Sequence, residues 1–123
     1  MRCASATDVA QTLAQVHRDW GSIRLLIHAA GLNRSTPLVT KPLDEFRRIR
    51  DLKVRGHVHL AAALAGSPPG LWLNFGSLLG MTGQAGEADY ASANDFLGFA
   101  PWRGPDRAPA NAPSGGPCGA KSA

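Results

Sequence analysis

The chain has 123 residues, of which 44% are hydrophobic, and its formal net charge is +4. This length allows at most one domain, and this apolar fraction excludes a wholly disordered protein. No run of eighteen apolar residues occurs, which excludes a membrane-spanning helix, and the first residues lack the apolar stretch of a signal peptide. We therefore expect a cytoplasmic protein.

The cysteines and the charges exclude two further classes of site. Cys3 and Cys118 stand near opposite ends, without a CxxC motif or a Cys/His cluster, so we expect neither a disulfide nor a metal site. Basic residues alternate with acidic ones over residues 44–55 (DEFRRIRDLKVR). This pattern is typical of a solvated helix face, and we favour it over a nucleic-acid-binding patch.

The first predicted element is a helix over residues 7–19, in which apolar residues recur at helical spacing, at Val9, Leu13, Val16 and Trp20. Thr7 or Asp8 is the expected N-cap, and Gly21 is expected to end the helix. Residues 23–31 (IRLLIHAAG) form a short apolar run that predicts a strand buried on both faces.

The remaining elements continue an alternation of helices and strands. We expect, in order, a long helix from Pro42 or Leu43 to about Leu64, a second strand of buried type over 71–75, a Gly-rich loop over 77–88 and a third helix over 89–99. This alternation predicts a parallel sheet. Proline recurs every four residues from Pro101 onward, so residues 101–123 are predicted to be a disordered tail behind a partial domain at 1–100.

Four polar side chains stand where a carbonyl could be bound. Lys53 falls near the centre of the apolar arc of the long helix, where an unpaired ammonium is costly to bury, unless it snorkels to an edge. Ser77 follows the second strand at its carboxyl end, although a serine there is often only a helix cap. Tyr90 and Asn94 are four residues apart and share a helix face; a half-buried aromatic residue and an asparagine with a nearby partner are the simpler interpretations. His57 is expected to be a packed residue.

Taken together, these residues and their motifs resemble the short-chain dehydrogenase/reductase superfamily, and more closely the ketoreductase domains of type I polyketide synthases. The matching segments are HAAG at 28–31, LKVRG at 52–56 and NFGSLLGMTGQAGEADYASAND at 74–95. The placement of Lys53 on the long helix and Asn94 after the tyrosine is the exchange that marks the ketoreductase branch. The resemblance implies a partial doubly wound, Rossmann-like α/β fold.

The resemblance also implies roles for individual residues. Tyr90 would donate a proton to the ketone oxygen, Ser77 would hydrogen-bond that oxygen, and Asn94 would support the proton relay. Lys53 would hold the cofactor ribose and favour the tyrosinate that forms. Small residues would lie against the NADP(H) cofactor, namely Ala29, Ala30 and Gly31. The substrate would be a β-keto acyl thioester on a carrier protein or a related thiol, reduced within a homo-oligomer or a larger synthase.

The sequence departs from this family in one important respect. No Gly-rich turn precedes Ile23, and Ala4 stands where an aspartate is expected, so we interpret the chain as a fragment of a longer reductase. Two alternatives stay open. The first is a non-catalytic ketoreductase remnant that serves as an interaction module, and the second is a basic nucleic-acid binder.

Overall fold

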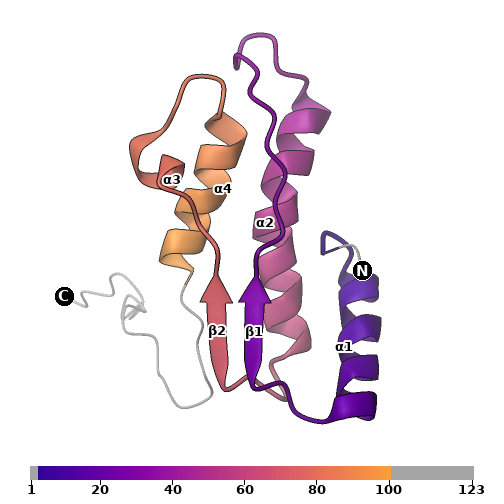
Figure 1. The fold of residues 1–123 in the computed structure, drawn as a ribbon. Helices are drawn as coiled ribbons and strands as arrows, with labels where there is room; N and C mark the ends of the chain where they lie inside the picture. Colours follow the sequence, from indigo (N-terminus) through magenta and orange to yellow (C-terminus); the bar gives the residue numbers. More distant parts are fainter. Residues whose placement is uncertain (1–2, 101–123) are drawn as a thin grey trace, which may run out of the picture.

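The computed structural model describes residues 3–100. Its elements in chain order are helix α1 (Ala6–Trp20), strand β1 (Leu25–His28), helix α2 (Leu43–Ala63), strand β2 (Leu71–Asn74), helix α3 (Leu79–Thr82) and helix α4 (Ala88–Phe99). The two strands pair in parallel, with their residues in the register Leu25 to Leu71 and His28 to Asn74. Figure 1 shows α2 behind the strands, α1 to one side, and α4 near the carboxyl ends of the strands. The predicted partial Rossmann-like α/β fold is confirmed.

Helix α1 begins one position earlier than predicted. Ser5, not Thr7 or Asp8, is the N-cap: its backbone is extended and its side chain accepts a hydrogen bond from the Asp8 amide. A serine hydroxyl in this position satisfies one of the amides that the first helical turn leaves free. Gly21 ends the helix as expected, with a φ of 79° and its amide donating to the His17 carbonyl.

The hydrophobic core lies between α1, α2 and one face of the sheet. Its buried members are Val9, Leu13, Leu60, Leu64 and Trp72. Trp20, which the helical spacing placed on the same stripe, is 79% exposed instead. It is the last residue of α1, where the chain turns toward β1, so the stripe is buried only along the earlier turns.

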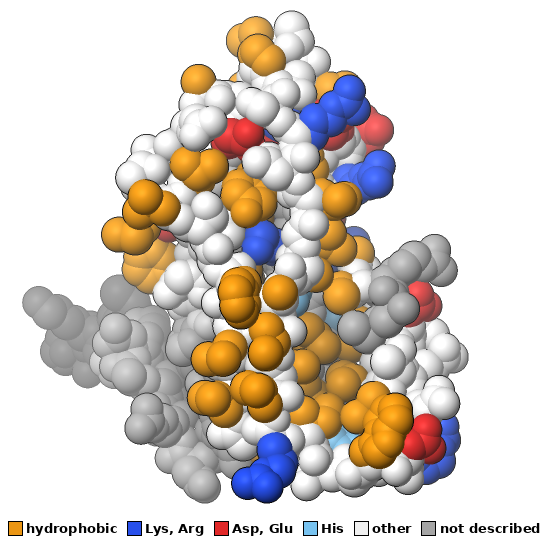
Figure 2. Space-filling view, viewed as in Figure 1, with side chains coloured by type: hydrophobic (Ala, Val, Ile, Leu, Met, Phe, Trp, Pro, Cys, Tyr) orange, Lys and Arg blue, Asp and Glu red, His pale blue; other side chains and the backbone are white. Residues whose placement is uncertain are grey.

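The prediction that both strands are buried on both faces is wrong. Leu25, Ile27, Leu71 and Leu73 are each between 42% and 52% exposed, whereas the intervening positions face α2. In Figure 1 no described helix crosses the front of the sheet, and Figure 2 shows apolar side chains gathered there. Successive strand residues point to opposite faces, so one half of each apolar run is left open.

The Gly-rich segment predicted as a loop contains the short helix α3. Gly80 lets α3 approach α4, because a Cβ at Gly80 would stand 2.7 Å from the Asp95 nitrogen. Within residues 3–100, no helix is long and apolar enough to cross a membrane. The predicted disordered tail and Cys118 lie outside the described residues.

Candidate active site

Lys53 is buried in the middle of α2 with only 4% of its surface exposed. Its ammonium donates a hydrogen bond of 2.8 Å to the Phe75 carbonyl oxygen, at the carboxyl end of β2. Burial lowers the pKa of Lys53 from its ordinary value. In the described part of the chain the ammonium makes no ion pair, so it does not snorkel to an edge and its positive charge is uncompensated.

Two polar side chains at the strand ends, His28 and Asn74, hydrogen-bond to the helix that carries Lys53 and form a polar clasp on it. His28 and Asn74 are partners at the last register position of the two strands. The Nε2–H of His28 donates to the Lys53 carbonyl at 3.0 Å, and the Asn74 side-chain oxygen accepts from His57 Nδ1 at 3.3 Å and from Trp72 Nε1 at 2.7 Å. The two strand ends therefore contact α2 at two positions one helical turn apart, Lys53 and His57. These contacts fix where Lys53 lies relative to the sheet.

His57 is a packed residue, as predicted. Its ring lies 5.0 Å from the Trp72 ring and 5.8 Å from the Phe96 ring, measured between centroids. Burial lowers the pKa of His57 and of His28; for His28 the bond to the Lys53 carbonyl works in the opposite direction. In both cases the net effect favours the neutral imidazole.

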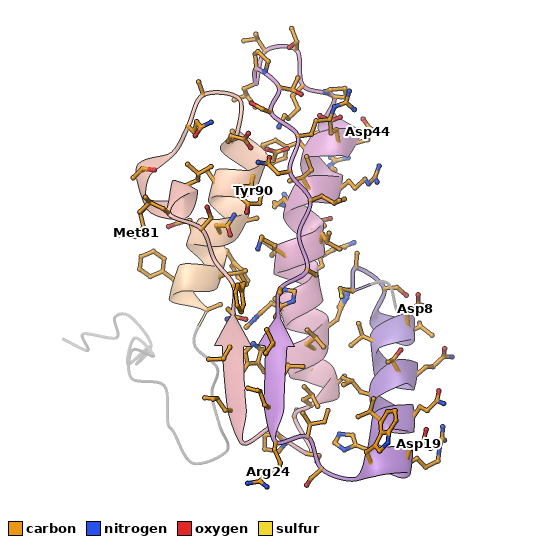
Figure 3. The ribbon with its side chains drawn as sticks, viewed as in Figure 1. Asp8, Asp19, Arg24, Asp44, Met81 and Tyr90 are labelled. Atoms are coloured by element: carbon orange, nitrogen blue, oxygen red, sulfur yellow. The ribbon has the colours of Figure 1, made fainter. Side chains whose placement is uncertain are left out.

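Tyr90 and Asn94 lie on α4, and the structure joins both to the surroundings of Lys53. The Lys53 ammonium is 5.8 Å from the centre of the Tyr90 ring. Figure 3 shows Tyr90 on α4 beyond the carboxyl ends of the strands. Asn94 has the partner expected of it, because its Nδ2 donates to the Tyr90 carbonyl at 2.7 Å. Its buried Oδ1 has no hydrogen-bond partner among the described residues.

Ser77 follows β2, as predicted, but its hydroxyl is engaged locally. Its Oγ accepts a hydrogen bond of 3.3 Å from the Leu79 amide at the start of α3. The bond spans two residues and is that of a turn, since the N-cap of α3 is Leu78, so Ser77 has the role of a turn residue. A hydroxyl that accepts one bond still has a proton to donate, so the predicted contact with a ketone oxygen stays a prediction.

Two neighbouring cavities meet at Gly31 and Leu32. The first, of about 290 Å³, has Lys53, Tyr90 and Ala29 in its wall. The second, of about 680 Å³, is lined by Ala30 together with residues of α2. A Cβ at Gly31 would stand 3.2 Å from Lys53 Cε. A side chain at Gly31 would therefore press on the end of the Lys53 side chain.

The sequence analysis missed a buried ion pair next to Tyr90. Lys41 Nζ lies 2.7 Å from both carboxylate oxygens of Asp89, and the two side chains are 1% and 0% exposed. The residues are 48 positions apart, and neither pattern nor spacing links them. An acidic residue in the first turn of a helix is usually a solvated partner of the helix dipole, so Asp89 gave no signal of burial.

Comparison with known proteins places this geometry in a family. The chain matches the model of the KR domain over residues 2–113. It belongs to the KR domain family. It is 40% identical over 90 residues to erythronolide synthase EryA3 of Saccharopolyspora erythraea, and 31% identical over 90 residues to polyketide synthase PksN of Bacillus subtilis. These alignments cover 71% and 73% of this chain, but only 3% and 2% of the synthases, so the KR domain described here spans a small part of their length.

A solved structure supports the same fold. The NAD+-bound xylitol dehydrogenase superposes with a TM-score of 0.72 at 27% identity, over 78% of this chain and 39% of the dehydrogenase. The KR domain therefore shares the fold of this dehydrogenase over most of its length, in agreement with the Rossmann-like fold that the sequence motifs implied.

The residues present fit one end of a nicotinamide cofactor. The smaller cavity combines a buried, unpaired ammonium with the small residues Ala29 and Gly31 in its wall. These groups suit a ribose and its attached ring, because an ammonium donates to hydroxyls and small residues allow a flat ring to approach. A Gly-rich turn for the pyrophosphate is absent from residues 3–20, since Gly21 is the first glycine of the chain.

Proposed function

We propose that this KR domain carries the proton-transfer part of an NADPH-dependent reduction of a β-keto acyl thioester to a β-hydroxy acyl thioester. The observation that carries the proposal is the uncompensated Lys53 ammonium beside Tyr90 in the wall of one cavity. A positive charge beside a phenol favours the phenolate that forms when the phenol gives up its proton. Burial strengthens that effect because water screens the charge less.

Each residue of the site has a distinct role in this proposal. When bound, the cofactor supplies a hydride to the carbonyl carbon. The carbonyl electron pair moves to oxygen, and the Tyr90 hydroxyl transfers its proton to that oxygen, which leaves a tyrosinate beside Lys53. The Ser77 hydroxyl donates a hydrogen bond to the developing alkoxide. Asn94 holds the Tyr90 carbonyl, and its buried Oδ1, which has no partner among the described residues, would accept a hydrogen bond in the proton relay.

The preference for NADPH and the nature of the substrate follow from the family alone. We propose an acyl chain carried on a carrier protein because the similar proteins are polyketide synthases of much greater length. A synthase of this kind also provides the larger assembly in which the KR domain would act, either as one part of a long chain or as a homo-oligomer.

The test measures NADPH oxidation with a small β-keto thioester, comparing the full chain with Tyr90→Phe and with Arg47→Gln. Tyr90→Phe removes only the hydroxyl, and Arg47 is an exposed residue of α2 that lies outside the walls of both cavities. Loss of proton donation is expected to lower turnover by about 100-fold or more. NADH replaces NADPH in a parallel assay. Equal turnover by wild type and Tyr90→Phe would remove Tyr90 from the mechanism.

A second candidate function is a KR-like remnant that acts as an interaction module. The observation that favours it is the open apolar sheet face formed by Leu25, Ile27, Leu71 and Leu73. The dehydrogenase that superposes on this chain extends well beyond the matched part, so the partner of this module would be further strand and helix segments of a reductase. Absence of both NADPH binding and turnover would favour the module over the enzyme, provided that the chain sediments faster when those segments are added. The Ile27→Glu variant should abolish that increase.

A further inference from the structure

The buried pair Lys41 and Asp89 is hydrogen-bonded to completion. Besides both Asp89 oxygens, the Lys41 ammonium donates to the carbonyl oxygens of Arg34 at 3.0 Å and Gly86 at 3.1 Å. An ammonium has three protons to donate and no acceptor, so these partners use its full capacity. Removing two such charges from water costs several kcal/mol for each ion, and the bonds offset that cost.

The pair joins the loop that precedes α2 to the start of α4. Lys41 belongs to the loop before α2, and Gly86 belongs to the turn before α4. The Thr36 amide also donates to the Gly86 carbonyl at 3.1 Å. Gly86 has a φ of 83°, and a Cβ there would stand 2.7 Å from Ser35 Oγ. The loop before α2 and the start of α4 are therefore packed as one unit.

The same pair reaches the backbone of Tyr90. Asp89 Oδ1 accepts a hydrogen bond of 2.8 Å from the Tyr90 amide, and the Tyr90 carbonyl accepts from Asn94 on its other side. Asp89 is in turn held by Lys41 through both carboxylate oxygens. A chain of short bonds thus runs from the loop before α2, through the ion pair, to the peptide groups that carry the phenol.

We propose that Lys41 is a positioning residue for Tyr90, acting through Asp89. It fixes where the phenol stands relative to the Lys53 ammonium and to the loop whose residue Asn33 lies in the cavity wall. This inference rests on the proposed ketone reduction. An apolar pair of similar volume would fill the same space at a comparable free energy. Such a pair would leave the Arg34 carbonyl and the Tyr90 amide without the bonds that set their positions, and the Gly86 carbonyl with the Thr36 amide as its one remaining partner among those described.

The experiment uses the full chain and the double variant Lys41→Met with Asp89→Leu, which exchanges the ion pair for apolar side chains of similar volume. Turnover of the β-keto thioester is expected to fall on the order of tenfold to a hundredfold, because a displacement near 1 Å has effects of that size. The KM is expected to change far less than turnover. The matched control is Arg34→Gln in the same loop, which removes the exposed ion pair with Glu45 of α2 but leaves the Arg34 carbonyl in place.

A second readout does not depend on activity. Tyr90 is the only tyrosine in the chain, so ring-labelled tyrosine gives a single set of NMR signals. In the folded double variant the Tyr90 ring signals are expected to shift and the Tyr90 amide to exchange faster, whereas Arg34→Gln leaves both unchanged. A folded double variant with unmoved signals and wild-type turnover would overturn the proposal.

The two readouts separate failure of the inference from failure of the function on which it rests. If the wild-type chain shows no turnover, the proposed reduction fails for this chain, and the Tyr90 signals decide the positioning role alone. Unmoved signals in the double variant would then reject it. If Lys41→Met by itself does not fold, the double variant still decides, because it leaves no buried charge without a partner.

Discussion

Two lysines of this KR domain are buried, and they are bonded in opposite ways. Lys41 meets a buried carboxylate and two carbonyl oxygens, so its charge is neutralised and every proton is used. Among the described residues, Lys53 meets a single carbonyl and no carboxylate, and burial lowers its pKa. The first arrangement is what stability requires of a buried ammonium. The second is costly, and such a cost is typical of a group that is held ready for chemistry.

The difference teaches that burial of a charge does not by itself identify a catalytic group. Lys41 is as deeply buried as Lys53 and lies beside the same tyrosine, yet its bonds organise the backbone rather than face the cavity. Only Lys53 lines the cavity that Tyr90 also lines. Replacement of Lys41 should therefore lower the stability more than replacement of Lys53 does, and replacement of Lys53 should lower turnover more than replacement of Lys41 does.

The largest expected effect on stability is that of Lys41→Met. The change leaves the Asp89 carboxylate buried without its counterion, and we expect a loss of about 3–5 kcal/mol in the free energy of unfolding. Lys53→Met is expected to change that free energy by no more than about 1 kcal/mol, because the loss of one hydrogen bond to the Phe75 carbonyl is offset by removal of a charge that is costly to bury. Urea denaturation measures both. Equal losses in the two variants would contradict the comparison.

A smaller contrast is expected at the two glycines nearest the lysines. Gly86→Ala places a Cβ on a backbone with a φ of 83° and against Ser35, and should cost about 2–3 kcal/mol. Gly31→Ala meets only the flexible end of Lys53, so its cost in stability should stay below about 1 kcal/mol.

The displaced ammonium of Gly31→Ala should nevertheless lower NADPH-dependent turnover about tenfold. Gly66→Ala is the control, since nothing lies within 4 Å of a Cβ at that position. A Gly31→Ala variant with full activity would show that the position of Lys53 is not critical.

The smallest expected effect is a pH dependence that comes from the clasp holding Lys53. Because burial lowers the pKa of His28 and His57 in the folded state, the unfolded chain takes up protons first as the pH falls below about 6.5. The stability that the two neutral histidines contribute is fully present above that pH. It is lost as the pH falls through the pKa values that His28 and His57 have in the folded state.

The measurement is the urea midpoint at pH 7.5 and at pH 5.5, for wild type and for His57→Phe. The phenyl ring keeps the packing on Trp72 and Phe96 but cannot take up a proton, so the variant should lose less stability on acidification. A drop in the midpoint as large as that of the wild type would exclude His57 as a source of the pH dependence.

The sequence predicted the bounds of a helix well where a single glycine or proline marks its start or its end. Gly21 ends α1 because it adopts the positive φ that the turn requires, and Pro42 precedes α2 because its fixed φ suits a helix start. Prediction from the sequence was less accurate where several neighbouring residues could each serve as the N-cap, or where glycines stand inside a helix. Ser5 takes the N-cap from Thr7 and Asp8, and α3 forms within a segment whose glycines predicted a loop.

The same limits hold for the site. Helical spacing was enough to place Lys53 toward the core and Asn94 beside the Tyr90 backbone, because both follow from local geometry within one helix. The pairing of Lys41 with Asp89 could not be predicted, since it depends on how two loops 48 residues apart are packed. The open sheet face escaped prediction for a related reason: an apolar strand residue does not reveal whether a helix covers it.

The sequence by itself determined the alternation of the longer helices and strands, the family, and Lys53, Tyr90 and Asn94 as candidate site residues, because these depend on local periodicity and on motifs of fixed spacing. Only the tertiary structure decided that, among the described residues, Lys53 is buried without a counterion while Lys41 has one. The physical reason is that the environment of a charge is set by groups far apart in the chain. Their contacts exist only once the loops and helices have packed.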